Sequence, residues 1–224
     1  MGDLLFEKST KVELACETEN STIRYTLDGS VPTENSTLYE KPFEVSESTV
    51  LKMKAFAPGR KASQVFTWKL EKAVLKDAVT LTSAKPGLKY DYFEKFFVNV
   101  TDLDLVNPIL SGVTKNFTID EKKRENYFGF RFSGYIKVPK DGIYTFYLKS
   151  NDGSRLYIHG EELIENDANH GAVEEPGSIA LKAGYHPIMV KYMQCGGGKS
   201  LLVSWSGPGM QKHEIQSREL FVEK

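Results

Sequence analysis

This 224-residue chain has very little cysteine, no excess of one charge and no long apolar run. Its two cysteines, Cys16 and Cys195, are too few and too far apart for a disulfide framework or a Cys-x-x-Cys metal site. The 29 Lys and Arg residues balance 30 Asp and Glu residues, so no strong field attracts nucleic acid. No apolar run approaches the ~18 residues that cross a bilayer. We therefore expect no nucleic-acid partner and no membrane span.

Short segments of alternating apolarity fill the sequence instead. In the clearest case the apolar residues fall on even positions, so that in a strand they point to one face: Phe128, Phe130, Phe132, Ile136 and Val138. Dipeptides typical of tight reversals separate such segments: Asp141-Gly142, Asp152-Gly153, His159-Gly160 and Ala183-Gly184. This pattern predicts an all-β protein built from antiparallel β-sandwiches.

One segment, residues 70–81, has two interpretations. Its apolar residues are spaced near i, i+3 and i+4 without Gly or Pro, which fits a helix: Leu70, Ala73, Val74, Ala78 and Leu81. It also fits the end of one strand, a charged connection and the start of another strand, because Val79 and Leu81 alternate. We favour the second interpretation and place the domain boundary here, with a first domain over 1–72, a linker over 73–83 and a second domain over 84–224.

The first domain carries a distinctive motif, because residues 23–33 read IRYTLDGSVPT and are followed by Ser36, Tyr39 and Pro42. Asp28-Gly29 predicts a hairpin turn in this motif. The motif resembles the immunoglobulin-like domain that follows the catalytic barrel of chitobiase and related β-hexosaminidases. The resemblance implies a small immunoglobulin-like sandwich without a catalytic residue, over about residues 9–70.

The second domain carries an ordered series of aromatic and glycine motifs: YFGFRFSGYI at 127–136, DGIYTFYL at 141–148, SNDGSRLYIHG at 150–160, LKAGYH at 181–186 and SWSGPG at 204–209. This series resembles the PA14 β-sandwich, which is named for a fragment of anthrax protective antigen and occurs in glycosidases, yeast adhesins and many secreted proteins. The resemblance implies a larger antiparallel PA14-type β-sandwich over about residues 84–222.

Oxygen-bearing side chains gather on the predicted loops at one end of the second domain. Asn151 and Asp152 share a sharp turn, and Gln194 begins a loop that contains three consecutive glycines. Carboxylate and amide oxygens are ligands that Ca²⁺ prefers. Tyr157 is out of phase with the core-facing residues beside it, so its ring should face outward. These loops are the candidate ligand end of the domain.

The PA14 resemblance gives this end a function. In yeast adhesins of the family, two adjacent Asp residues at the positions of Asn151 and Asp152 hold Ca²⁺, and the ion coordinates sugar hydroxyls. The resemblance therefore implies a Ca²⁺ site at Asn151 and Asp152 and a carbohydrate site formed by these side chains: Asp152, Arg155, Tyr157 and Gln194. Ca²⁺ is the one cofactor expected.

Two departures from the family pattern weaken this expectation. Asn151 in place of Asp removes one negative charge from the ion site. The family's Asp-Asn-Trp-Gly segment is replaced by Glu165-Asn166-Asp167-Ala168, which removes an aromatic ring. In the alternative interpretation Asp152 is a turn carboxylate that accepts hydrogen bonds from nearby backbone N–H groups.

The sequence shows no catalytic centre. Its four histidines lack metal-binding spacing, and no carboxylate pair or nucleophile motif stands out. We therefore expect that the chain is not itself an enzyme. It is predicted to be a non-catalytic carbohydrate-binding or carbohydrate-presenting accessory region of a secreted glycoside hydrolase of the β-hexosaminidase kind. Its expected partners are a glycan and the catalytic domain of the parent protein. The alternative is a structural spacer or protein-interaction module with no glycan ligand.

The expected location is secreted, periplasmic or at the cell surface. This follows from the families that the two domains resemble. Residues 1–8 lack a basic-then-apolar signal peptide, so we expect that any native signal has been removed from this sequence.

Overall fold

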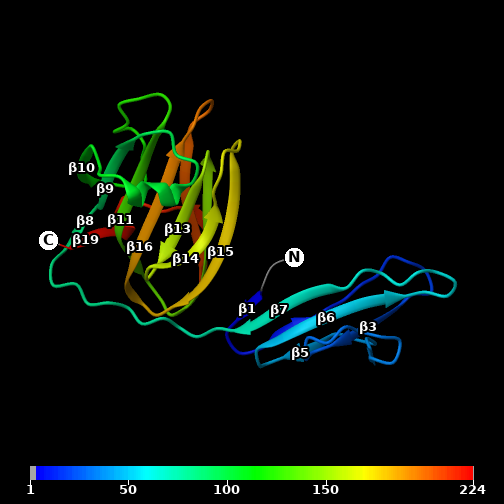
Figure 1. Ribbon diagram of the computed structural model, residues 1–224. Helices are drawn as coiled ribbons and strands as arrows, with labels where there is room; N and C mark the ends of the chain where they lie inside the picture. The colour runs from blue at the N-terminus through cyan, green and yellow to red at the C-terminus, as the bar shows by residue number, and fades with distance from the viewer. Residues whose placement is uncertain (1–3, 224) are drawn as a thin grey trace. The chain divides into compact units, whose positions relative to one another are not determined.

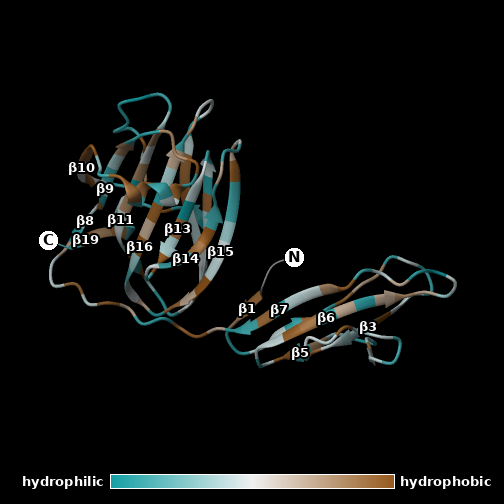
Figure 2. Ribbon diagram, in the orientation of Figure 1, coloured by the Kyte–Doolittle hydropathy of each residue, from teal (hydrophilic) through white to brown (hydrophobic). Residues whose placement is uncertain are grey.

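The computed structural model describes residues 4–223 and divides into two compact units between Val74 and Leu75. Both units are built from β-strands, with two short 3-10 helices in the described chain (Figure 1), as the sequence predicts. Hydrophobic and hydrophilic residues alternate along several strands (Figure 2). No helix forms between Leu70 and Leu81, so the helical interpretation of that segment is wrong. Within residues 4–223, no helix is both long enough and apolar enough to cross a membrane.

The first unit is a small sandwich made of a five-stranded and a two-stranded sheet. Its strands are β1 (Leu4–Phe6), β2 (Thr10–Val12), β3 (Thr22–Thr26), β4 (Thr37–Leu38), β5 (Phe43–Val45), β6 (Thr49–Phe56) and β7 (Phe66–Lys72). The larger sheet has the order β1-β7-β6-β3-β4, with β1 parallel to β7, and the smaller one pairs β2 with β5. The buried core of the unit consists of Phe6, Val12, Val45, Leu51, Met53 and Leu70.

The motif at 23–33 bends the chain after β3, but Asp28-Gly29 is not the tight hairpin turn predicted: Asp28 forms a bridge with Val50, and the turn before β4 is closed by a hydrogen bond from Ser36 N to Thr33 O (3.1 Å). One carboxylate oxygen of Asp28 accepts hydrogen bonds from the backbone N–H (2.9 Å) and the hydroxyl (2.6 Å) of Ser30. These two bonds lower the pKa of Asp28. Gly29 has a φ of 78°, a conformation that glycine adopts without steric cost. The motif therefore has a structural role, and the Asp28 carboxylate is used in hydrogen bonds to Ser30.

The second unit is a larger sandwich made of an eight-stranded and a four-stranded sheet. Its strands are β8 (Ala84–Pro86), β9 (Leu88–Glu94), β10 (Leu110–Thr114), β11 (Phe128–Val138), β12 (Gly142–Asn151), β13 (Ser154–Ile158), β14 (Glu161–Asn166), β15 (Val173–Leu181), β16 (Gly184–Gln194), β17 (Ser200–Gly207), β18 (Met210–Glu214) and β19 (Leu220–Glu223). The helices are η1 (Val100–Leu105) and η2 (Ser217–Glu219). The sheet orders are β10-β9-β11-β16-β13-β14, with β19 joined to β11 and β8, and β15-β12-β17-β18.

The long pair of β11 and β16 forms the centre of this sandwich. The two strands are antiparallel over their whole length, from Phe128 opposite Gln194 to Val138 opposite Gly184. The predicted alternation is confirmed, because the core-facing residues of β11 are buried: Phe128, Phe130, Phe132, Ile136 and Val138. Trp205 from the four-stranded sheet is buried in the same core. The two sheets therefore enclose one aromatic-rich core.

A separate apolar cluster covers part of the eight-stranded sheet on its outer side. The segment between β9 and β10 contains η1, whose Val100 and Leu103 are fully buried. They pack with residues that point away from the main core: Phe93, Phe97, Met193 and Cys195. Gly129 allows this approach, since a Cβ there would lie 2.5 Å from Leu103 Cδ2. We call this group the outer cluster.

The predicted linker is attached to the second unit over most of its length. The hydrogen bonds are Lys76 N to Ala180 O (2.9 Å), Lys182 N to Lys76 O (3.0 Å), Val79 N to Tyr185 O (2.8 Å) and Thr82 N to Glu223 Oε1 (2.9 Å). Residues from 76 onward are thus part of the second unit, whereas the sequence predicted that this domain starts at 84. Backbone bonding across such distances leaves no periodic pattern, which is why the sequence did not show it.

Candidate functional site

Several loops meet at one end of the second unit. The β14–β15 and β16–β17 loops lie at this end (Figure 1). The β12–β13 turn joins them, because Ser154 after the turn pairs with Tyr192 near the end of β16. We call this region the loop end. It contains three of the five predicted site residues, Asn151, Asp152 and Gln194.

Asp152 is buried beneath the β16–β17 loop, with only 1% of its surface exposed. Its Oδ2 accepts hydrogen bonds from the backbone N–H groups of Cys195 (2.8 Å) and Gly196 (3.2 Å). The peptide bond before it, from Asn151, is cis. Burial raises the pKa of the Cys195 thiol, and the charge of Asp152 adds to this effect. The carboxylate therefore fixes one loop to another rather than its own turn.

Gln194 shapes the same loop from inside. Its Nε2 donates hydrogen bonds to the carbonyl oxygens of Gly196 (2.9 Å) and Gly198 (3.1 Å). The Tyr192 hydroxyl lies within hydrogen-bonding distance of the Gln194 side-chain oxygen and of the carbonyl oxygen of Asn151 (2.6 Å). Burial raises the pKa of Tyr192, as does the charge of Asp152. Gln194 thus connects the turn and the glycine loop into one structure.

Arg155 lies on the outward face of β13 and has its donors occupied. Its Nε pairs with Asp167 (2.9 Å), its NH1 with Glu162 (2.7 Å) and its NH2 with Glu165 (2.9 Å). The Asp167 carboxylate also accepts a hydrogen bond from the Val100 N–H (3.1 Å), so the network reaches η1. Arg155 therefore holds β14 and the helix against the sheet, and its part in glycan binding remains a prediction.

Tyr157 also faces away from the core, as predicted, but it is partly buried. The Lys191 ammonium lies 5.4 Å from the centre of its ring. Lys191 in turn pairs with Asp104 of η1 at 2.5 Å, and Arg131 NH1 reaches the same carboxylate at 3.3 Å. The structure therefore groups Tyr157 with a charged row on the sheet and not with Asp152.

An exposed aromatic pair at the loop end was missed in the sequence. The rings of Phe96 and Tyr127 are 58% and 49% exposed and meet edge to face, with centroids 5.7 Å apart. The Tyr127 N–H donates to the Gln194 carbonyl oxygen (2.8 Å), which places the pair beside the glycine loop. Tyr127 has a φ of 61°, which is uncommon for a residue other than glycine. The sequence did contain one signal for this pair: Tyr127 directly precedes Phe128 and so lies outside the alternating apolar series of β11.

The oxygen atoms around Asp152 match Ca²⁺ in chemistry but supply little charge. The loop end offers one carboxylate, the Asn151 amide and the carbonyls of Gly196 and Gly198, both of which already accept from Gln194 Nε2, whereas Ca²⁺ takes six to eight oxygens. A Cβ at Gly198 would lie 3.4 Å from the Asn151 side-chain nitrogen, so the turn and the loop are close together. Within residues 4–223, no three His, Cys, Asp or Glu side chains are placed to hold a metal. Ca²⁺ binding at Asn151 and Asp152 is therefore still a prediction.

Comparison with protein families confirms both resemblances and their order. A model described as PA14 domain matches residues 84–219, and one described as chitobiase/beta-hexosaminidase C-terminal domain matches residues 5–67. A beta-hexosaminidase of Porphyromonas gingivalis is 29% identical over 176 residues, which are 73% of this chain and 22% of that protein. The anti-sigma-I factor RsgI3 of Acetivibrio thermocellus is 26% identical over 136 residues, 60% of this chain and 21% of that protein. The chain thus spans about a fifth of the length of these curated relatives.

Solved structures confirm the all-β fold class. The PA14 domain of the antifreeze protein MpAFP aligns with a TM-score of 0.55 and 18% identity, covering 66% of this chain and 96% of that one. A PA14 sugar-binding domain from an RTX adhesin gives 0.53 and 18%, covering 62% and 99%. An anti-sigma factor domain-containing protein from Clostridium clariflavum gives 0.53 and 19%, covering 99% and 82%, and so extends over both units.

Proposed function

Because the chain belongs to the PA14 domain family and carries a chitobiase/β-hexosaminidase C-terminal domain ahead of its PA14 domain, we propose that it is a non-catalytic carbohydrate-binding region. In this proposal it is an accessory part of a secreted glycoside hydrolase of the β-hexosaminidase kind. The Porphyromonas gingivalis relative, named a beta-hexosaminidase, and the adhesin domain, named sugar-binding, support the proposal. The catalytic domain of the parent protein and a glycan are its proposed partners.

The observation that carries the proposal is the composition of the loop end. Two exposed aromatic rings, Phe96 and Tyr127, stand beside a loop held in place by Asp152 and Gln194. Exposed rings offer flat apolar area at low entropic cost, and the C–H face of a pyranose ring can stack on them. Backbone groups of the glycine loop can approach a ligand closely, because no side chains cover them.

Asn151 and Asp152 are the proposed Ca²⁺ ligands at this end. The ion would add positive charge where sugar hydroxyls can reach it, and the single carboxylate makes its affinity low. Arg155 and Tyr157 are proposed to shape the site from the outer face of β13, because Arg155 fixes the Asp167 end of the β14–β15 loop. Asp152 and Gln194 hold the β16–β17 loop in position through hydrogen bonds from beneath it.

A glycan array tests the proposal. The intact chain is applied with and without Ca²⁺, together with Phe96→Ala and Tyr127→Ala. The matched control is Phe66→Ala, which removes an exposed aromatic ring from the first unit. We expect bound glycans that disappear in the two loop-end variants and persist in the control. Binding that is equally strong in all three variants would reject the loop end as the site.

A second function is a structural spacer or interaction module with no glycan ligand. The observation that favours it is the pairing of all three Arg155 nitrogens with carboxylates and the burial of Asp152 by contacts within the chain. Groups occupied in this way have little left to offer a ligand. An array without any bound glycan, combined with an unfolding transition that Ca²⁺ does not move, would support this function over the first.

A further inference from the structure

A groove opens on the outer face of β11, at the point where the strand changes its neighbour. Ser133 still pairs with Lys89 of β9, whereas Tyr135 pairs with Phe221 of β19. The volume of the groove is about 470 Å³. Gly134 lies at its floor, and a Cβ there would come within 2.6 Å of the Phe221 carbonyl oxygen. We call this hollow the Gly134 groove.

The Gly134 groove has a mixed lining of apolar and polar side chains. Its larger members come from four strands: Tyr135, Pro187 and Met189 on the apolar side and Lys89, Ser133 and Glu223 on the polar side. Among residues 4–223, the Lys89 ammonium has no hydrogen-bond or ion-pair partner, although its charge contributes to lowering the pKa of Glu223. Glu223 uses its Oε1 for the N–H and hydroxyl of Thr82 (both 2.9 Å), which fixes the side chain at the edge of the groove.

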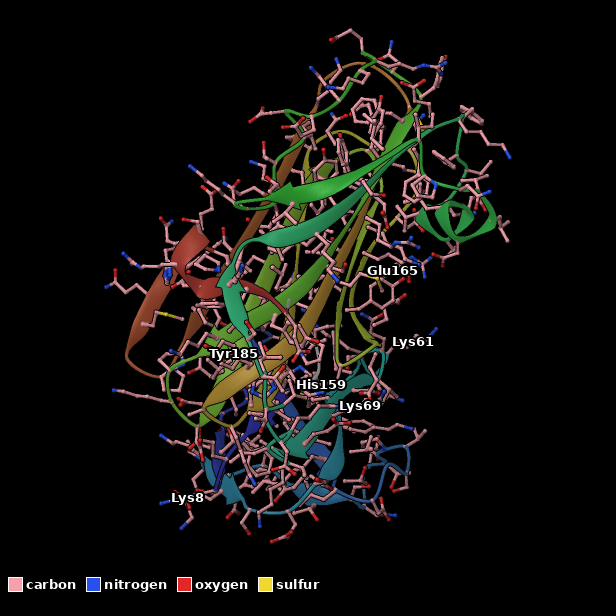
Figure 3. The ribbon with its side chains drawn as sticks, turned by 90° about the vertical axis from the view of Figure 1, so that its left-hand side faces the viewer. Lys8, Lys61, Lys69, His159, Glu165 and Tyr185 are labelled. Atoms are coloured by element: carbon pink, nitrogen blue, oxygen red, sulfur yellow. The ribbon has the colours of Figure 1, made fainter. Side chains whose placement is uncertain are left out.

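The groove is separate from the loop end. Tyr135 is seven positions along β11 from Phe128, where the strand leaves the loop end, and a strand advances ~3.3 Å per residue. The two regions are therefore ~20 Å apart. Figure 3 shows His159 and Tyr185, from the same end of the sheet as the groove, well below Glu165 on β14.

We infer that the Gly134 groove is a second saccharide site, which binds one or two neutral pyranose rings. Its volume lies within the ~300–1,000 Å³ of small-molecule sites. The C–H faces of a pyranose pack on Tyr135 and Met189, and its hydroxyls accept from Lys89 and donate to Glu223.

Charge and polarity select this ligand class over two others. An anion would pair with Lys89 but meet the negative charge of Glu223 on β19, which follows β9 as the neighbour of β11. A purely apolar ligand would remove water from Lys89 and Glu223 without replacing their hydrogen bonds, which is costly. A neutral polyol satisfies both groups.

Methionine methyl groups allow each site to be observed separately by NMR. Met189 lines the Gly134 groove. Met193 reports on the loop end, because its Cε lies 2.7 Å from the Cβ position of Gly153 next to Asp152. Met53 belongs to the core of the first unit and serves as a reference. In the intact chain, labelled with ¹³C at methionine methyls, D-glucose, D-galactose, D-mannose and N-acetyl-D-glucosamine are each titrated to about 20 mM, enough to populate a millimolar site.

We expect at least one of these sugars to move the Met189 signal with a saturating curve. Tyr135→Leu should weaken that binding about tenfold, whereas Tyr147→Leu, which removes a half-buried tyrosine from the outer face of the other sheet, should not. A second pair of variants leaves the aromatic packing intact: Lys89→Ala, which should weaken sugar binding, and its control Lys85→Ala, which removes an exposed lysine and should not. A shift of Met193 alone would overturn this inference and leave the proposed function standing. A Met189 signal that none of the four sugars moves would also overturn it. So would a Met189 signal that a sugar moves in Tyr135→Leu and Lys89→Ala as strongly as in the wild-type protein.

Discussion

The Oδ2 atom of Asp152 lies 2.8 Å from the backbone nitrogen of Cys195, so one buried carboxylate joins the β12–β13 turn to the β16–β17 loop. A second bond reaches Gly196 N at 3.2 Å. Both donors come from the loop that carries the three consecutive glycines. The order of the loop end thus depends on a carboxylate that lies beneath the loop and is only 1% exposed.

Asp152→Ala should destabilise the second unit by about 1–3 kcal/mol, because it leaves the buried N–H of Cys195 without an acceptor. Asp141→Ala is the matched control. Asp141 also accepts a backbone N–H, from Ala183 at 2.7 Å, but it is exposed and water can replace it. Its loss should cost about 0.5 kcal/mol or less. Urea unfolding followed by circular dichroism measures both, and equal losses would contradict the structural role of Asp152.

Ca²⁺ should raise the melting temperature of the intact chain if the weak site at Asn151 and Asp152 binds the ion. A ligand that binds only the folded state stabilises it by RT ln(1 + [L]/Kd). Asp152→Ala should abolish the rise, and Asp141→Ala should retain it. If millimolar Ca²⁺ does not change the melting temperature of the wild-type protein, the ion site is absent. That result would not affect the proposed role of the aromatic pair, Phe96 and Tyr127, in glycan binding.

Gly153→Ala should destabilise the loop end by about 1–3 kcal/mol through overpacking. The new Cβ would lie 2.7 Å from both Asp167 Oδ1 and Met193 Cε and 3.0 Å from the Ala168 carbonyl oxygen. Gly196→Ala is the control, because no atom lies within 4 Å of its Cβ position. Thermal unfolding of the two variants provides the comparison. A Gly153→Ala protein as stable as wild type would show that this region repacks freely.

Acidification should destabilise the second unit through a histidine pair at its linker side. The His186 Nε2 lies 2.8 Å from the Lys182 carbonyl, which only accepts, so the His186 Nδ1 accepts from His159 Nε2 at 2.8 Å. Burial lowers the pKa of both rings, and the Lys76 charge lowers that of His159 further, with Glu161 opposing it. The unfolded chain then binds more protons than the folded one, so stability falls as the pH drops below about 6.5.

Two variants with opposite effects test this dependence. His159→Gln keeps a donor for His186 but removes one titrating ring, so the stability lost between about pH 7.5 and pH 5 should shrink. His213 differs, because hydrogen bonds to the Gln211 carbonyl and to Glu219 raise its pKa and stabilise the fold in acid. His213→Gln should therefore enlarge the loss. Urea unfolding at both pH values measures it, and two variants with the wild-type difference would contradict the assignment.

A fragment that starts at residue 75 should be more stable than one that starts at 84. Both contain the whole PA14 sandwich, and the shorter one lacks the hydrogen bonds from Lys76, Val79 and Thr82 to the second unit. A fragment of residues 1–74 should fold separately, because its core is its own. Melting curves of the three fragments provide the measurement. If the fragments of 1–74 and 75–224 are both unfolded while the whole chain is folded, the two-domain division is wrong.

The sequence predicted those features that depend on local alternation and turns. Phe128 and Trp205 are core residues, and Tyr157 points away from the core, because strand period alone determines these faces. The sequence could not predict contacts between distant segments. Asp152 bonds to Cys195, His159 to His186 and Lys76 to Ala180, each through a register that only the folded sheets define. The sequence therefore predicted that Asn151, Asp152 and Gln194 lie on neighbouring loops, but not that Asp152 is buried and hydrogen-bonded to the β16–β17 loop; their role in binding is still a prediction.

The buried thiol of Cys195 can report how often the glycine loop opens. It lies in the outer cluster with its pKa raised, whereas Cys16 in the first unit is exposed and has its pKa lowered by hydrogen bonds from Ser21 and Thr18. The thiolate is the reactive form, so a thiol reagent labels Cys16 first. In a Cys16→Ser protein, the rate at which Cys195 is labelled then measures how often the loop and η1 separate.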